Sequence, residues 1–243
     1  EKADNKLFKS FLTPKFLLRY APGSMRKETL GSRINPLDIY SLDRLNNTNN
    51  FESGLSATLG FDYKILGKER EFNLSVGQII NEKENKNMPS ITSLDNKLSD
   101  LVGSSSLKIN DKLNFDYNFS IDQNYSDVNY SEVTSTLNLD SLKIDFNYLR
   151  EMKHIGNDEY FKTKIAFLQN ENKEFSLEAK RNLITNSSEY YDLSYEYIND
   201  CLRAGLVYRR EFYNDSEIES ENSFMFKITL VPFGNIETPS INR

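Results

Sequence analysis

The sequence has 243 residues, of which 38% are hydrophobic, and a formal net charge of −6. The length allows a sizeable core, whereas the negative charge argues against a general nucleic-acid binder, which normally carries a basic excess. No stretch approaches the ~20 consecutive apolar residues of a membrane helix. The single cysteine, Cys201, excludes an internal disulfide framework and a multi-cysteine metal site.

Alternation of apolar and polar residues with a period of two recurs along the chain and predicts β-strands. In KLNFDYNFSID, residues 112–122, every second side chain from Leu113 to Ile121 is apolar. About twelve such segments are expected, at residues 12–20, 51–65, 69–80, 99–109, 112–123, 128–139, 142–150, 159–169, 174–183, 189–198, 201–212 and 222–233. Most are longer than the roughly five or six residues usual in strands, and they match the ~9–11 tilted residues that cross a bilayer.

The connections between these segments alternate in length. Short turns rich in Asn and Asp, such as 110–111, 140–141 and 199–200, alternate with longer polar loops such as 21–50 and 81–98. Tight Asn and Asp turns favour hairpins between antiparallel neighbours. Short turns at one end and longer loops at the other are typical of outer-membrane barrels.

The apolar faces could pack together in a soluble β-sandwich or face lipid in a membrane barrel. Aromatic residues near the segment ends favour the membrane, because an interfacial aromatic girdle is expected there. These residues are Phe51, Tyr63, Tyr117, Tyr148 and Tyr208. We therefore predict an all-β, antiparallel, up-and-down transmembrane β-barrel of about twelve strands, forming one domain over residues 1–243, with the sandwich as the alternative.

Five stretches, in this order along the chain, resemble the barrel of the LPS-assembly protein LptD family, also called the organic-solvent-tolerance protein. They are TPKFLLRYAPGSMRK (13–27), IYSLDRLNNTNNFESGLSATLGFDYK (39–64), REFNLSVGQII (70–80), LSDLVGSSSLKINDKLNFDYNFSID (98–122) and NDCLRAGLVYRREFYNDSEIESENSFMFKITLVPFGNI (199–236). The chain opens at Glu1 without an apolar leader, so we expect a cytosolic protein or an internal piece of a longer chain. The resemblance favours the latter. It implies the C-terminal portion of a larger barrel, without its early strands and N-terminal periplasmic domain.

The resemblance also implies a function without chemistry or cofactor. Members pass lipopolysaccharide from a periplasmic Lpt bridge, which the absent N-terminal domain would contact, into the outer leaflet of the bacterial outer membrane. The plug lipoprotein LptE fills the barrel, and the lipid leaves through a lateral gate between the first and last strands. The implied partners are thus lipopolysaccharide, LptE, the Lpt bridge and outer-membrane lipid, with no nucleic acid.

Two groups of residues take a role from the resemblance. Cys201 follows a short turn, where the family commonly has adjacent cysteines that pair with N-terminal ones; a disulfide to the absent portion and a free thiol both stay open. The last predicted strand would form one side of the gate. Its relevant residues are Phe224, Phe226, Ile228, Leu230 and Pro232, and Pro232 lacks a backbone donor near the strand end.

Polar residues on the opposite face are expected to line a wet lumen. For the face as a whole we favour contact with LptE and sugars, whereas for each named residue we favour a merely hydrated barrel interior. They are Asn114, Asp116, Asn118, Asp145 and Asn147. Cationic side chains in the loop 21–50 are weaker candidates for binding lipopolysaccharide phosphates. They are Arg26, Lys27, Arg33 and Arg44, with Asp38 and Asp43 nearby.

Two alternative functions stay open. One is another outer-membrane channel or receptor built on the same alternation. The other is an outer-membrane hydrolase, which would need the only histidine, His154, beside a nucleophile. We expect His154 to be solvated in a polar loop, and no glycine-rich phosphate-binding motif is present. We therefore predict that the protein is not an enzyme.

Overall fold

The computed structural model describes residues 8–45, 49–153, 156–170, 172–212, 221–230, 234–237 and 241–242. The chain divides into two compact units. The first comprises Glu1–Asn110, Asn114–Val133 and Leu149–Asp158, and the second comprises Asp111–Leu113, Thr134–Tyr148 and Glu159–Arg243. Strands β6 (Val128–Leu139) and β7 (Leu142–Glu151) contribute residues to both.

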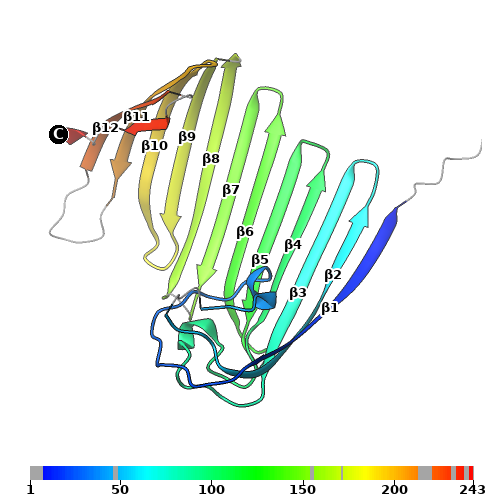
Figure 1. Ribbon diagram of the computed structural model, residues 1–243. Helices are drawn as coiled ribbons and strands as arrows, with labels where there is room; N and C mark the ends of the chain where they lie inside the picture. Colours follow the sequence, from blue (N-terminus) through cyan, green and yellow to red (C-terminus); the bar gives the residue numbers. More distant parts are fainter. Residues whose placement is uncertain are drawn as a thin grey trace, which may run out of the picture. The chain divides into compact units, whose positions relative to one another are not determined.

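The first unit contains five strands in chain order (Figure 1): β1 (Lys9–Ala21), β2 (Gly54–Leu66), β3 (Arg70–Asn81), β4 (Leu101–Ile109) and β5 (Leu113–Ile121). Strands β1 to β4 pair antiparallel in an unbroken register. Among the described residues of this unit, β1 pairs with β2 alone and is therefore the edge strand. Two short 3-10 helices, η1 (Asp38–Tyr40) and η2 (Ser90–Thr92), lie in the connections 22–53 and 82–100.

The second unit continues the up-and-down pattern with β8 (Asp158–Asn170), β9 (Lys173–Asn182), β10 (Ser187–Ile198), β11 (Leu202–Glu211) and β12 (Glu221–Leu230). Each of these strands is antiparallel to the next. Two short strands, β13 (Gly234–Glu237) and β14 (Ile241–Asn242), both pair with β12. A bulge interrupts the β9–β10 register between Ser188 and Tyr190.

The predicted strands correspond to β1–β12, so the all-β, antiparallel, up-and-down fold is confirmed. The largest differences lie at the first two strands, which begin at Lys9 and Gly54 instead of at 12 and 51. The later start of β2 has a local cause. Gly54 has a φ of +111°, a left-handed conformation that interrupts the extended chain, so Phe51 belongs to the preceding loop. Residues 231–233 of the last predicted strand lie outside the described residues.

In the long strand pairs whose register is described, residues directly opposite each other form one apolar face. In the first unit Phe16 lies opposite Leu59, and Phe61 lies opposite Val76. The same holds in the second unit, where Leu206 lies opposite Phe226. These side chains stay exposed, with 65% of Phe16 and 50% of Leu206 accessible. A contiguous exposed apolar surface marks contact with a membrane or a partner, so the buried core must lie elsewhere.

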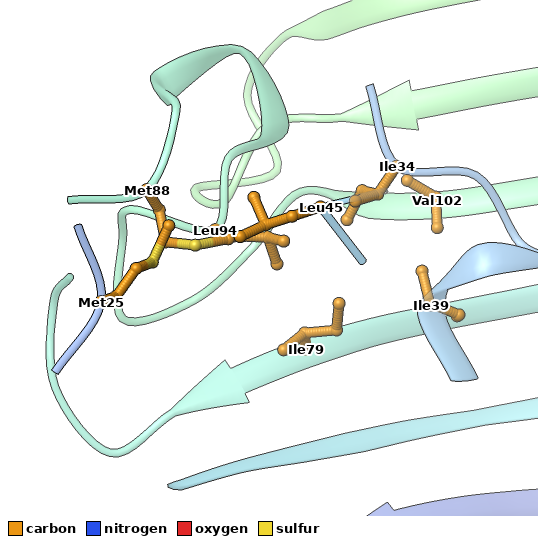
Figure 2. Packing of buried hydrophobic residues seen from close by; sticks show 8 residues of the cluster. All are labelled: Met25, Ile34, Ile39, Leu45, Ile79, Met88, Leu94 and Val102. Atoms are coloured by element: carbon orange, nitrogen blue, oxygen red, sulfur yellow. The ribbon is translucent and has the colours of Figure 1, made fainter. Parts of the chain in front are cut away.

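That core lies in the first unit, where the two long connections pack on the polar face of the sheet (Figure 2). Its apolar side chains come from the connection 22–53, from the connection 82–100 and from strands β3 and β4. They are Met25, Ile34, Ile39, Leu45, Met88, Leu94, Ile79 and Val102. Ile79 and Val102 are apolar residues on an otherwise polar face, and burying them holds the connections against the sheet.

A pair of glycines makes room for helix η1. Gly60 and Gly77 lie opposite each other on β2 and β3, and Ile39 and Tyr40 fill the space where their side chains would stand. The Thr58 hydroxyl donates a hydrogen bond to the Ile39 carbonyl at 3.1 Å. The sequence Asp38–Tyr40 therefore docks on the polar face because two opposing residues have no Cβ atom.

We predict that Gly60→Ala releases this contact. The added methyl group would overlap the Val76 carbonyl oxygen and the Tyr40 hydroxyl, so the free energy of unfolding should fall by about 1–3 kcal/mol. Urea unfolding of the detergent-solubilised chain, together with protease cleavage in the connection 22–53, measures the effect. Gly205→Ala is the matched control, because its methyl would meet the flexible Glu196 side chain at 3.1 Å and the Tyr195 carbonyl oxygen only at an ordinary contact distance of 3.8 Å. Equal stability of the two variants would contradict the docking.

Candidate functional site: the two faces of the sheet

A buried ion cluster joins the connection 22–53 to β1 and β2. The Arg44 Nε donates to a carboxylate oxygen of Glu52 at 2.7 Å, and its Nη2 donates to the other oxygen and to the Ser56 hydroxyl. Arg19 donates to the Leu42 carbonyl at 2.7 Å and to the Glu52 carbonyl. The Arg44 side chain is fully buried and that of Glu52 is 5% exposed. The Arg19 Nη1 also lies 3.7 Å from a carboxylate oxygen of Glu52, so this one carboxylate contacts two buried guanidinium groups.

A second set of contacts surrounds Tyr40. Lys15 forms an ion pair with Asp62 and lies over the Tyr40 ring, 5.3 Å from its centroid. The Ser75 hydroxyl donates to Asp62 at 2.7 Å. Burial, and then the negative charge of Asp62, raise the pKa of Tyr40. The phenol, whose oxygen is buried, therefore stays neutral.

Arg33 fastens the same connection to β6 and β7. Its guanidinium forms an ion pair with Glu151 and lies 3.2 Å from the centroid of the Tyr130 ring. The Tyr130 hydroxyl donates to Glu132 at 2.6 Å. Glu151 is 4% exposed, so Arg33 compensates a buried carboxylate.

Asp100 fastens the connection 82–100. One of its carboxylate oxygens accepts hydrogen bonds from the Ser120 hydroxyl at 2.9 Å and the Asn129 amide at 2.8 Å. Its backbone N–H donates to the Ser93 hydroxyl at 3.0 Å. The side chain of β5 residue Ser120 thereby identifies the polar side of β5, on which Asn114, Asp116 and Asn118 also lie.

The turn after β5 is held by Asp122. Its carboxylate accepts the backbone N–H groups of Ser126 at 2.8 Å and Asp127 at 3.1 Å. These hydrogen bonds, that from Asp127 first, lower the pKa of Asp122. The turn is therefore stabilised while Asp122 is ionised, and that contribution is lost as the pH falls through its lowered pKa.

The polar face of the second unit is a ladder of paired charges. Arg209 binds Asp192 with two hydrogen bonds of 2.7 Å. Glu178 accepts the Tyr190 hydroxyl at 2.7 Å. Further ion pairs cross the strands at Lys164–Glu174, Lys162–Glu178, Lys180–Glu189 and Arg203–Glu196. Several of these side chains are partly exposed, so this face is hydrated and nearly neutral.

The other predicted lumen residues take part in similar contacts. Asp145 accepts the Thr136 hydroxyl at 2.8 Å and lies 3.2 Å from the Lys143 ammonium. Asn147 lies on the same side of β7 as Asp145. The structure thus groups Asn114, Asp116 and Asn118 in the first unit, and Asp145 and Asn147 in the second. Their contact with a plug protein or with sugars stays a prediction.

Two of the four loop cations proposed for phosphate binding have another role. Arg33 and Arg44 are committed to buried carboxylates of the chain itself, Glu151 and Glu52, so the phosphate assignment is wrong for them. Arg26 and Lys27 are exposed in the same connection. Sequence reasoning missed the buried pairs because the acid lies 118 positions from Arg33 and 8 positions from Arg44. The signal that could have indicated a docked loop is an apolar residue on the polar face, such as Ile79.

The described residues that were assigned to a gate lie on β12, where they face β11. Phe224, Phe226, Ile228 and Leu230 lie opposite Tyr208, Leu206, Ala204 and Leu202 on β11. The other edge of β12 is partly covered, since β14 pairs at Ser223–Phe224 and β13 at Lys227–Leu230. Pro232 lies outside the described residues. Cys201 is an exposed free thiol in the β10–β11 turn, where its backbone N–H donates to the Asn199 side chain at 2.9 Å.

Within the described part of the chain, no helix is long and apolar enough to cross a membrane. Among these residues, no three His, Cys, Asp or Glu side chains gather as metal ligands would. His154, on which the hydrolase alternative depends, lies outside them.

Long antiparallel strands with one exposed apolar face and one charged face define a transmembrane β-strand protein of the outer-membrane type. The family model described as "LPS transport system D" matches residues 6–191. The chain therefore belongs to the LptD family, a family of lipopolysaccharide transport, and is a protein of the bacterial outer membrane, as predicted.

Comparisons with individual proteins are weaker. No curated protein matches the chain. A mutant of the Rh. blastica porin has a TM-score of 0.41 and 7% identity, covering 91% of this chain and 89% of the porin. A triple mutant of the Rhodopseudomonas blastica porin has a TM-score of 0.38 and 8% identity, covering 97% and 98%. The family match, and not these likenesses, carries the assignment.

We predict that Glu52→Gln detaches the connection 22–53 from the sheet. The substitution leaves the buried Arg44 guanidinium without its charged partner and removes the nearer acid from Arg19, so the free energy of unfolding should fall by about 3–5 kcal/mol. Urea unfolding of the chain measures this loss. Ser56→Ala removes only one hydrogen bond of the same cluster and should cost about 1 kcal/mol. A loss for Glu52→Gln no larger than for Ser56→Ala would show that the carboxylate does not hold the cluster together.

Proposed function

We propose that this chain inserts lipopolysaccharide into the outer leaflet as part of an LptD–LptE translocon. The observation that carries the proposal is the amphipathic sheet: exposed apolar rows on one face and a hydrated, charge-paired ladder on the other. Lipopolysaccharide has the same division, with acyl chains and a polar sugar portion. The apolar rows would hold the acyl chains while the sugars pass along the polar face.

The proposed exit is lateral and runs beside β12. Phe226 and Phe224 are 47% and 56% exposed, so an acyl chain can contact them. For β12 to pair with or part from another strand, β13 and β14 must leave its edge. Backbone hydrogen bonds join only short parts of β12 to these strands, which makes this edge easier to free than the fully paired β11 edge.

The plug partner would contact the polar face of the second unit. In the first unit, the docked connections already cover the polar face around Ile79 and Val102. In the second unit, the Lys162 and Arg203 side chains remain 42% and 47% exposed on that face. A partner rich in polar groups would fit this neutral ladder. In this proposal Cys201 pairs with a cysteine of the N-terminal region, outside the present sequence.

A photo-crosslinking amino acid at Phe226 in the full-length protein in cells tests the exit. We expect an adduct with lipopolysaccharide that disappears when the upstream periplasmic bridge is blocked. Leu59 on β2 is the matched control, because it is also on the apolar face and, like Phe226, is 47% exposed, yet it lies ten strands from β12.

Bridge-dependent labelling at Phe226 and not at Leu59 supports a lateral exit at β12. If an assembled barrel gives no lipopolysaccharide adduct at Phe226, or gives one that ignores the bridge, the proposed exit is refuted. Equal bridge-dependent labelling at both positions would refute an exit confined to β12.

A further inference from the structure

Two arginines interrupt the apolar face of the second unit at one end of its strands. Arg181 is the next-to-last residue of β9 and Arg210 is the next-to-last residue of β11. Arg181 lies opposite Phe161 of β8, and Arg210 lies opposite Tyr191 of β10. Both therefore stand on the face of Leu177 and Leu206, at the strand ends that lead into the connections 183–186 and 212–220.

The β10 bulge keeps this face free of an acid. If the register continued without the bulge, Glu189 would lie opposite Arg181. The bulge places Ser188 there instead, and the Ser188 hydroxyl lies 2.9 Å from the Tyr191 hydroxyl. Glu189 turns to the polar face, where it lies 2.7 Å from the Lys180 ammonium. A β-bulge can redirect a side chain to the other face of a sheet, and here it moves the Glu189 carboxylate away from Arg181.

The two guanidinium groups thus lack a carboxylate among the residues that the structure describes. Arg181 donates one hydrogen bond, at 2.6 Å, to the Asn186 side chain. Arg210 lies 5.1 Å from the centroid of the Phe212 ring. By contrast, Arg203 and Arg209 on the polar side of β11 each bind an acid. An arginine has five donors, and most of those on Arg181 and Arg210 bind no group that the structure describes.

The side chains next to the two arginines on the same face are aromatic and then aliphatic, an order that matches an amphiphilic ligand. Tyr191 and Phe212 contact edge to face with centroids 5.4 Å apart, and the Tyr208 and Phe224 rings lie 5.0 Å apart. Aromatic residues of this kind mark the boundary between headgroups and hydrocarbon. Further along the same face lie the exposed side chains of Leu193, Leu206 and Phe226. A ligand here would have an anionic head above an apolar body.

We propose that Arg181 and Arg210 form a binding site for the phosphorylated head group of lipopolysaccharide on the outward face of the sheet. The two arginines lie two strands apart, roughly 10 Å across the sheet, which lets one head group contact both guanidinium groups. Arginine binds phosphate through paired, charge-assisted hydrogen bonds. This inference rests on the proposed function, and it takes the strand ends at the longer connections as the outer ones, as in outer-membrane barrels.

The test uses the full-length protein assembled with its partner and extracted from outer membranes. The lipopolysaccharide retained per protein is measured by mass spectrometry after detergent washing. The variant R181Q/R210Q should retain at least tenfold less than the unmodified protein. K112Q/K173Q, which removes two positive charges at the opposite strand ends of the same unit, should retain as much as the unmodified protein. R181K/R210K keeps the charges and should retain an intermediate amount.

A second arm identifies the ligand chemistry by adding back defined lipids. Lipopolysaccharide stripped of its head-group phosphates should bind the unmodified protein as poorly as intact lipopolysaccharide binds R181Q/R210Q. Vesicles of phosphatidylglycerol should not compete. Unchanged retention by R181Q/R210Q, equal losses in the K112Q/K173Q control, or equal competition by phosphatidylglycerol would each overturn the proposal. If R181Q/R210Q does not assemble, R181K/R210K and the phosphate-stripped lipid still decide.

The Phe226 crosslink separates this inference from the proposed function. Bridge-dependent crosslinking together with unchanged retention by R181Q/R210Q would refute the head-group site alone. Loss of retention in R181Q/R210Q without any bridge-dependent crosslink would refute the lateral exit and leave the head-group site standing.

Discussion

Hydrogen bonding between neighbouring antiparallel strands is the interaction on which the other features of this protein depend. In a bilayer, a backbone N–H or C=O group without a partner costs several kcal/mol, so long strands must pair along most of their length. Pairing fixes the register, and the register decides which side chains share a face. The alternation in the sequence therefore becomes two continuous surfaces, one apolar and one charged.

The departures from that alternation are the informative positions. Ile79 and Val102 put apolar side chains on the polar face, and the long connections cover them. Gly60 and Gly77 remove side chains from the same face, and η1 fills the space. The docking of the connections on the polar face thus depends on residues of the strands as much as on the sequence of the connections themselves. Because the ion cluster at Glu52 is buried with it, docking also excludes water from charges that would otherwise be hydrated.

The sequence was sufficient for the strands and insufficient for the loops. Strand β6 begins and ends at the predicted residues 128 and 139, since period two is a local signal that pairing preserves. The docked connections were not predicted, because contacts such as Arg33 with Glu151 join residues that no local pattern relates. Arg33 and Arg44 were therefore misassigned to phosphate: a cation in a polar loop has the same appearance in the sequence whether its carboxylate is near or absent. The short strands β13 and β14 were missed for lack of length.

Cationic side chains that pair with an acid of the chain stabilise the sheet, whereas those without such a partner are candidates for binding a ligand. On the polar face, Arg209 and Asp192 pair across strands, and Lys180 and Glu189 do the same. Such pairs stabilise the sheet and leave little charge for a ligand. Arg181 stands outside this scheme only because a bulge turns Glu189 away from it. A register shift of one residue would neutralise it and close the apolar face with an ion pair. The bulge therefore replaces an ion pair with a guanidinium group that no described carboxylate binds, at the strand end where an anionic head group would lie.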